Sequence, residues 1–245
     1  MVPKIIHYCW FGGNDLPQSA KMCIESWKKY CPDYQIIEHN EKNYDITKNQ
    51  YMKEAYEARK WAFVSDFARL DILYQEGGIY LDTDVELLKP LDSFLNCKGF
   101  MGFEDKKKVA SGLGMGAEKG SEIVRRLLDD YENIHFVDEQ GKFDLTPCPD
   151  RNTKTLCEIG LIPDGNRQCI NGGFEIYPRQ VFSPKESTSG RLKHKTEETV
   201  SIHHYDASWE TKDFHIKKKI NYIFGGRIGS LINKMLITCK ILEVR

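Results

Sequence analysis

The chain has 245 residues, a formal net charge of −1, 40% hydrophobic residues and 29% charged residues. This length suits one larger globular domain with a short appendage, and the near-neutral charge argues against a nucleic-acid binder, which usually carries a basic excess. The N-terminus lacks the apolar core of a secretion signal, no apolar run reaches the roughly 20 residues of a membrane span, and the eight cysteines form no C-x-x-C pair. We therefore expect a cytoplasmic protein with reduced thiols.

The first forty residues predict an α/β domain. Residues 4–9 read as a strand that runs into Gly12-Gly13, where the backbone can approach a ligand closely. Residues 18–30 then predict a helix, and residues 34–38 a second strand. A strand, a helix and a further strand in this order are typical of α/β proteins.

The next segment predicts one long helix followed by a strand. Apolar residues recur at helical spacing from about residue 53 to residue 76, and Gly77-Gly78 follow as a helix end. Residues 79–85 predict a strand, which Pro90 limits. Later elements are expected as strands near residues 99–103 and 113–117 and a helix near 121–131.

Two aspartates close the predicted strand over residues 79–85. Side chains alternate along a strand, so Tyr80, Asp82 and Asp84 would share one face. Neighbouring carboxylates repel each other unless a cation holds them, and oxygen-rich sites suit Mn²⁺ or Mg²⁺. Such an ion would keep positions open for diphosphate oxygens. By itself, however, a D-x-D tripeptide is more often a pair of solvated acids.

Asp66 and Arg69 lie on the helix that precedes this strand. Their spacing of three residues puts them on one helix face. An exposed ion pair of this kind contributes about 0–1 kcal/mol. Asp66 stands between Phe63 and Phe67, close to the apolar stripe, which favours a buried pair. The hydroxyl groups of a sugar could satisfy its remaining hydrogen bonds.

The run AFVSDFARLDILYQEGGIYLDTD, from Ala62 to Asp84, resembles the signature of the D-x-D sugar-binding-region glycosyltransferases. That group includes yeast-type initiating mannosyltransferases and bacterial capsule-synthesis transferases, and it is remotely similar to the glucosylating domain of large clostridial toxins. Residues 3–13 and 203–209 resemble the same family. The resemblance implies a GT-A glycosyltransferase domain over residues 1–214, an α/β fold with a mixed, mostly parallel sheet flanked by helices.

The resemblance also implies roles for single residues. Trp10 would stack on the nucleotide base, and Tyr80 would contact the nucleotide or the sugar. Asp66 and Arg69 would hold the donor sugar, with Arg69 also near the diphosphate.

For the metal, Asp82 would contact the ion and the ribose, and Asp84 would ligate the ion most directly. His203 or His204 is the expected third ligand; alternation puts them on opposite faces, and His203 matches the family spacing better. Ser208 and Trp209 would lie near the diphosphate.

The resemblance also implies a retaining hexosyltransferase that uses Mn²⁺ or Mg²⁺. A UDP-sugar is the favoured donor and GDP-mannose the alternative, with a glycan of a bacterial capsule or another surface polysaccharide as acceptor. Two other classes remain open: a non-catalytic module that binds glycans or sugar nucleotides, and a D-x-D phosphatase. The phosphatase is disfavoured because its motif normally opens the chain and is followed by Gly-Thr, whereas here Val85-Glu86 follow.

Residues 215–245 form a basic tail outside this domain. They carry seven Lys or Arg against Glu243, a charge of +6, which leaves −7 on the rest. From Ile228 onward, apolar residues recur at helical spacing. A basic amphipathic helix favours an anionic membrane surface, which would place the protein peripherally at the inner membrane face, near a lipid-linked acceptor. A terminal helix packed on the domain is the alternative.

Overall fold

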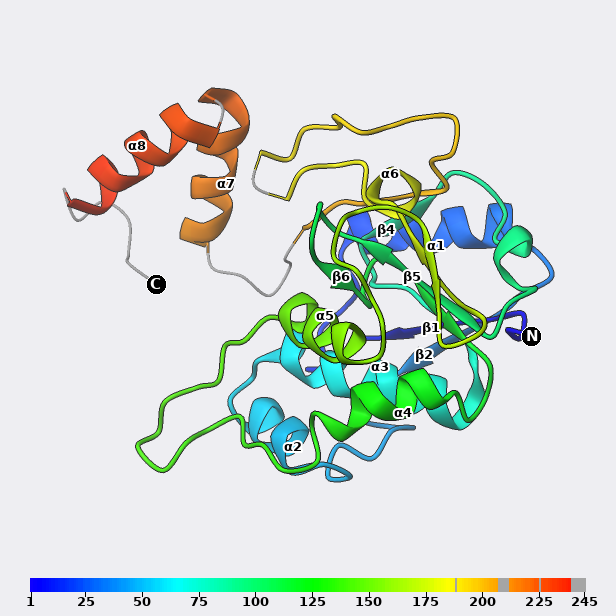
Figure 1. The fold of residues 1–245 in the computed structure, drawn as a ribbon. Helices are drawn as coiled ribbons and strands as arrows, with labels where there is room; N and C mark the ends of the chain where they lie inside the picture. Colours follow the sequence, from blue (N-terminus) through cyan, green and yellow to red (C-terminus); the bar gives the residue numbers. More distant parts are fainter. Residues whose placement is uncertain (188, 207–211, 225, 239–245) are drawn as a thin grey trace.

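A mixed sheet forms the centre of the structure, a computed structural model that describes residues 1–187, 189–206, 212–224 and 226–238 (Figure 1). The strands lie in the order β2 (Gln35–His39), β1 (Ile5–Cys9), β3 (Gly78–Tyr80), β7 (Met115–Ala117), β5 (Gly99–Phe103), β9 (Phe174–Tyr177) and β8 (Gln168–Ile170), with β6 (Val109–Ala110) beside β5. β2, β1, β3, β5 and β9 run one way; β7, β8 and β6 run against them. The expected mixed, mostly parallel sheet is confirmed.

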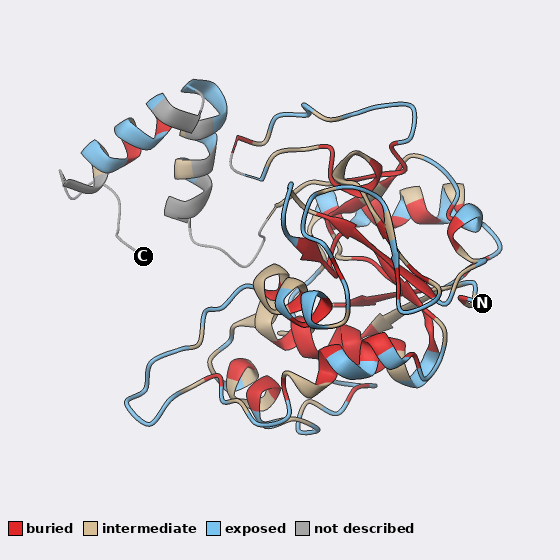
Figure 2. Cartoon of the chain, viewed as in Figure 1, coloured by how far each residue is buried: buried red, intermediate tan, exposed pale blue. Residues whose placement is uncertain are grey.

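Helices cover both faces of this sheet, and a hydrophobic core fills each side (Figure 2). One face carries α2 (Gln50–Glu57), α3 (Trp61–Glu76), α4 (Glu122–Asp129) and α5 (Cys148–Glu158). The other carries α1 (Gln18–Tyr30), α6 (Arg179–Phe182) and a two-stranded sheet of β4 (Val85–Leu87) and β10 (Ser201–His203). A 3₁₀ turn spans Asp92–Phe94. The fully buried Trp27 of α1 donates its indole N–H to the carbonyl of Val85, 2.7 Å away, and so ties α1 to β4.

The single helix expected from about residue 53 to 76 is wrong: the structure has α2 and α3 with a break between them. Arg59 takes a left-handed conformation at φ +56°, and the amides of Arg59 and Lys60 donate to the carbonyls of Tyr56 and Ala55. These two bonds form a Schellman motif, which ends α2. The left-handed position usually holds glycine. Because arginine occupies it here, the sequence lacks the usual signal of a helix end. Trp61 then begins α3.

The strand expected over residues 79–85 is also interrupted. β3 ends at Tyr80, a turn closed by the Val85 N–H to the Asp82 carbonyl at 3.0 Å follows, and β4 begins at Val85. Strand alternation therefore does not place the two aspartates on one face; the turn does. β4 pairs antiparallel with β10, in the register Val85 to His203, and this pairing brings a segment from far along the chain to the aspartates.

The basic tail contains α7 (Lys212–Phe224) and α8 (Gly226–Thr238), which lie beside each other in Figure 1. The Asn233 side chain donates to the carbonyl of Lys217 at 3.1 Å and links the two helices. Arg191 donates to the carbonyl of Tyr222 at 3.3 Å. Within the described residues, no helix combines the length and apolar character needed to cross a bilayer.

Candidate active site

The turn between β3 and β4 presents Asp82 and Asp84 at the end of the central sheet. Asp84 is 8% exposed and Asp82 is half-buried. The Asp82 N–H donates to the carbonyl of Gly112 at 3.1 Å. A Cβ atom on Gly112 would lie 2.0 Å from Asp82 Oδ2, so only glycine allows this close approach.

His203 completes a cluster with the two carboxylates. Its Nε2 atom lies 3.0 Å from Asp84 Oδ1 and 3.9 Å from Asp82 Oδ2. One ligand atom from each of the three residues lies within 4.8 Å of the others. His204 points elsewhere: its Nε2 lies 2.9 Å from Glu86 Oε2, and its Nδ1 lies 3.3 Å from Lys185 Nζ. The structure thus brings His203, and not His204, to the aspartates.

The charged groups of this cluster shift the pKa values of one another. Burial would raise the pKa of Asp84, but the charge and hydrogen bond of His203 outweigh it, and the pKa falls to about 2. Burial would lower the pKa of His203, but the carboxylates of Asp84 and Asp82 raise it instead. The Asp206 N–H also donates to Asp84 Oδ2 at 2.8 Å. Asp84 is therefore held as a carboxylate, the form in which it can ligate a cation.

Arg69 connects this cluster to α3. Its guanidinium lies 3.1 Å from Asp66 Oδ1 and 3.2 Å from Asp82 Oδ1. It also donates to the Ser65 carbonyl and hydroxyl, at 3.0 and 2.9 Å. The Tyr80 hydroxyl donates to Asp82 Oδ1 at 3.0 Å, while its ring centre lies 4.9 Å from the guanidinium carbon. Arg69 is 3% exposed, so this is a buried network and not a surface ion pair.

Asp66 has an unusual protonation equilibrium within this network. It is 8% exposed, and burial raises its pKa from the ordinary 3.8 to about 6, although Arg69 opposes the rise. With such a pKa the carboxyl group is mostly ionised at pH 7 and accepts hydrogen bonds, whereas below about pH 6 it is protonated and can also donate one. At neutral pH this suits hydroxyl groups, which donate to it.

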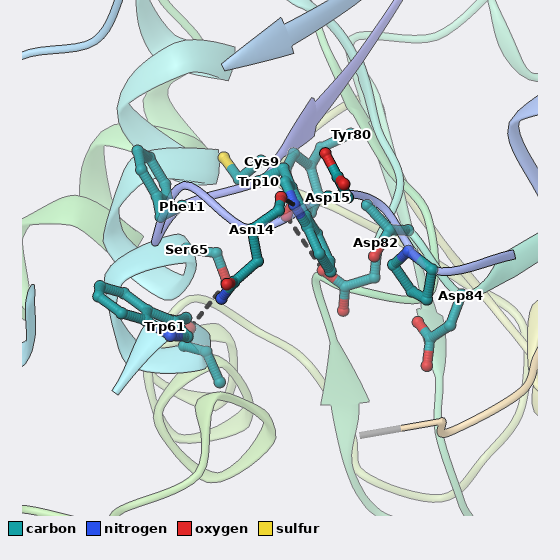
Figure 3. A pocket seen from close by; sticks show the side chains of 13 residues that line it. Cys9, Trp10, Phe11, Asn14, Asp15, Trp61, Ser65, Tyr80, Asp82 and Asp84 are labelled. Atoms are coloured by element: carbon teal, nitrogen blue, oxygen red, sulfur yellow. Dashed lines mark hydrogen bonds between the residues drawn. The ribbon is translucent and has the colours of Figure 1, made fainter. Parts of the chain in front are cut away.

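A first cavity of about 470 Å³ opens on one side of Asp82 and Asp84 (Figure 3). Trp10 and Trp61 both line it, and in Figure 3 Trp61 lies on the opposite side from the two aspartates. The Trp10 indole N–H donates to the carbonyl of Asn14 at 2.6 Å, which fixes the ring at the cavity edge. An aromatic wall facing two carboxylates suits a ligand with a planar base and phosphate groups bridged by a cation.

A second cavity of about 540 Å³ is also lined by Asp82. It shares Ala62, Ser65 and Asp82 with the first cavity, and Asp66, Arg69 and His203 line it as well. The polar network therefore lies between two chambers. Apolar side chains form much of the second chamber, among them Phe63, Leu113, Leu145 and Pro147.

Trp61 and Glu104 are among the lining residues that the sequence analysis did not single out. Trp61 begins α3, and a Cβ on Gly12 would lie 2.7 Å from its ring, so Gly12 lets the first loop pack against it. The paired glycines after the first strand were the available signal for this approach. Glu104 follows β5 and lines the second cavity; no sequence spacing connects it to the D-x-D turn. Ser208 and Trp209 lie outside the described residues.

The family profile described as "Glycosyltransferase sugar-binding region containing DXD motif" matches residues 17–100, which include the Asp66–Arg69 pair and the D-x-D turn. This segment is similar to the sugar-binding region of the DXD-motif glycosyltransferases. The expected resemblance to this glycosyltransferase family is confirmed.

Two curated relatives match about half of the chain. It is 29% identical over 147 residues to inositol phosphoceramide mannosyltransferase 3 of Schizosaccharomyces pombe, covering 55% of the chain and 40% of that protein. It is 29% identical over 126 residues to the initiation-specific alpha-1,6-mannosyltransferase of Candida albicans, covering 47% of the chain and 32% of that protein. The chain thus spans less than half the length of these relatives.

A solved structure titled "PaToxG Glycosyltransferase" shares the fold. It superposes with a TM-score of 0.51 at 21% identity, over 64% of this chain and 68% of that one. At this identity the likeness concerns the fold alone, and it confirms the expected GT-A type.

Proposed function

We propose that the chain is a divalent-metal-dependent, retaining glycosyltransferase that moves a hexose from a nucleotide sugar to a glycan acceptor. The observation that carries this proposal is the cluster of Asp82, Asp84 and His203 between two cavities, one with an aromatic wall and one with a buried Asp–Arg network. A transferase needs a place for the nucleotide and a place for the acceptor on either side of the reacting sugar.

The donor atoms of the cluster fit a divalent cation. One ligand atom from each of two carboxylates and an imidazole lies within 4.8 Å of the others, and the buried Nδ1 of His203 has no hydrogen-bond partner within the described residues. Carboxylates suit Mn²⁺ and Mg²⁺, whereas imidazole is rarer around Mg²⁺, which favours Mn²⁺. Such an ion, when bound, supplies positive charge that stabilises the departing nucleoside diphosphate.

The protein's own residues would bind and orient the donor. Trp10 offers a stacking surface for the base in the first cavity, and Tyr80 holds Asp82 in place by its hydrogen bond. Asp66 and Arg69, on the side of the second cavity, would bind the hydroxyls of the sugar. Ser208 and Trp209, from the segment after β10, are proposed near the diphosphate. Catalysis would then rest on positioning and on charge stabilisation of the leaving group.

The donor is proposed to be a UDP-sugar, with GDP-mannose as the alternative. The Trp10 platform favours the first by its resemblance to toxin-type glucosyltransferases, and the mannosyltransferase names of two relatives favour the second. A capsule or another surface polysaccharide is the proposed acceptor system.

A melting experiment tests the metal and nucleotide together. A ligand at 100 times its Kd adds about 2.7 kcal/mol of stability, which in a domain of this size raises Tm by roughly 5–10 °C. We expect that rise for UDP or GDP with Mn²⁺, and none for free hexoses. A sugar-binding module would respond to the free sugars instead, and a phosphatase would release phosphate from simple phosphate esters.

A donor-hydrolysis screen over UDP-sugars and GDP-mannose then identifies the substrate. Asp84→Asn should abolish both hydrolysis and the Mn²⁺-dependent rise in Tm. Glu86→Gln is the matched control, because its carboxylate lies against His204 and outside the cluster. Full activity in Asp84→Asn would overturn the metal assignment.

The tail is proposed to bind anionic membrane surfaces. α7 and α8 expose a set of large apolar side chains that sits among lysines: Ile216, Tyr222, Ile223, Phe224, Ile228, Leu231 and Met235. An exposed apolar surface with basic neighbours suits the interface of an anionic bilayer. We expect Leu231→Asp to reduce co-sedimentation with phosphatidylglycerol vesicles, whereas Met22→Asp on α1, which is equally exposed at 64%, should not. Equal sedimentation of both variants would contradict this assignment.

A further inference from the structure

Glu104 is a half-buried carboxylate just after β5 that lines the second cavity with Asp82 and His203. Its backbone is fixed on both sides. The Glu104 N–H donates to the Lys108 carbonyl at 2.7 Å, and the Glu104 carbonyl accepts from the Ser183 hydroxyl at 3.3 Å. The place of this carboxylate at the cavity wall is therefore set by the fold.

Tyr205 links Glu104 to the metal cluster. Its phenol lies 2.6 Å from the Ser183 hydroxyl, and burial together with the nearby Glu104 carboxylate raises the pKa of this phenol. Its ring packs against the His203 ring, with 4.2 Å between the centroids. Tyr205 adopts φ +55°, a conformation that costs a non-glycine residue about 1–3 kcal/mol and persists only when surrounding contacts hold it.

Glu104 stands beside the cluster without belonging to it. Among the described residues, the group of ligand atoms within mutual reach comprises Asp82, Asp84 and His203 only. Burial raises the pKa of Glu104, and the nearby His203 opposes the rise. A partly desolvated carboxylate gains stability from a hydroxyl that donates to it. The cavity supplies room for such a ligand.

The linings of the two cavities suit different ligands. The first has the aromatic wall of Trp10, and the second has apolar side chains such as Phe63 and Leu113 around its acidic groups. The apolar face of a sugar ring packs on such side chains, and its hydroxyls reach the acids. Building on the proposed function, we propose that the second cavity binds the acceptor saccharide and that Glu104 accepts the hydrogen bond of its attacking hydroxyl.

Donor hydrolysis tests this role before the acceptor is known, because water can occupy the place of the attacking hydroxyl. The variant is Glu104→Gln, and the matched control is Asp105→Asn. Asp105 caps the next turn through the amides of Lys107 and Lys108, which asparagine can still do. The readouts are hydrolysis of UDP-sugars and GDP-mannose, the Tm shift with UDP and Mn²⁺, and Mn²⁺ affinity.

We expect Glu104→Gln to lower kcat for hydrolysis about 10- to 100-fold, the usual effect of losing a hydrogen bond to a charged group. The donor KM, the Tm shift and the Mn²⁺ affinity should stay within about twofold of the control. A kcat equal to that of Asp105→Asn would overturn the inference. A matching loss of Mn²⁺ affinity would also overturn it, because Glu104 would then act through His203.

A different outcome would show that the proposed function itself is wrong. If UDP and Mn²⁺ leave the wild-type Tm unchanged and no donor is hydrolysed, that function is wrong and the role of Glu104 falls with it. If Glu104→Gln lowers the Tm of the free protein by several degrees, the same measurements are made on Glu104→Asp, which keeps the charge but retracts it. The inference predicts a reduced kcat there too, and an unchanged kcat would contradict it.

Discussion

Replacing Asp66 by asparagine should stabilise the protein at neutral pH while impairing its use of the donor. Burial raises the pKa of Asp66 to about 6, against an ordinary value of 3.8. The folded chain thus retains this proton to a higher pH than the unfolded chain, so stability falls as pH rises from about 4 to about 6. A shift of about two units corresponds to roughly 3 kcal/mol of lost stability at pH 7.

Asparagine has no charge to desolvate, but it loses part of the attraction to Arg69, 3.1 Å away. We therefore expect Asp66→Asn to be more stable than wild type by about 1–3 kcal/mol at pH 7. That gain corresponds to roughly 2–12 °C in Tm for a domain of this size. The loss of the carboxyl group that would bind donor hydroxyls should lower hydrolysis at the same time.

Urea unfolding of both proteins at pH 4, 5, 6 and 7 measures this effect. The stability of Asp66→Asn relative to wild type should grow by up to about 1.4 kcal/mol per pH unit between pH 4 and 6, and should level off above pH 7. Asp105→Asn serves as the control for a general effect of removing a carboxylate. A difference that is independent of pH, or that shrinks as pH rises, would refute the reasoning.

Three further predictions follow from the geometry. Gly112→Ala should lower both Mn²⁺ affinity and Tm, since its Cβ would lie 2.0 Å from Asp82 Oδ2; calorimetry showing wild-type affinity would contradict this. Trp10→Ala should weaken UDP binding about 5- to 150-fold, the usual range for a lost base–aromatic stack, and an unchanged Kd would exclude stacking. Burial lowers the pKa of His39 to about 4, so stability should fall as pH drops below about 6.5; His39→Gln should remove that component in urea titrations.

The sequence predicts the sheet and its first elements well because their signals are local. Alternation and turn residues indicate β1, α1 and β2 within one residue of their observed bounds. The end of α2 escaped prediction because Arg59 occupies a position that usually holds glycine. The break in the strand after Tyr80 was not predicted, because the turn over Thr83 and Asp84 depends on the pairing of β4 with β10, which lies more than one hundred residues away.

In the candidate site too, features with a local sequence signal were predicted and features that depend on distant contacts were not. The Asp66–Arg69 pair could be placed from helical spacing, since both residues lie within one turn of α3. The choice between His203 and His204 needed the register of β10, which places His203 opposite Val85. Glu104 could not be found, because it reaches its cavity through packing between elements that are distant in sequence. Trp61 had only the indirect signal of the paired glycines after the first strand.

The central claim is that Asp82, Asp84 and His203 bind a divalent cation that carries a nucleoside diphosphate. Calorimetric titration of Mn²⁺ into the wild-type protein in the presence of UDP tests it most directly, with Asp84→Asn and Glu86→Gln measured alongside. We predict one Mn²⁺ site in wild type and in Glu86→Gln, and its loss in Asp84→Asn. Binding of Mn²⁺ to Asp84→Asn with wild-type affinity would contradict the claim.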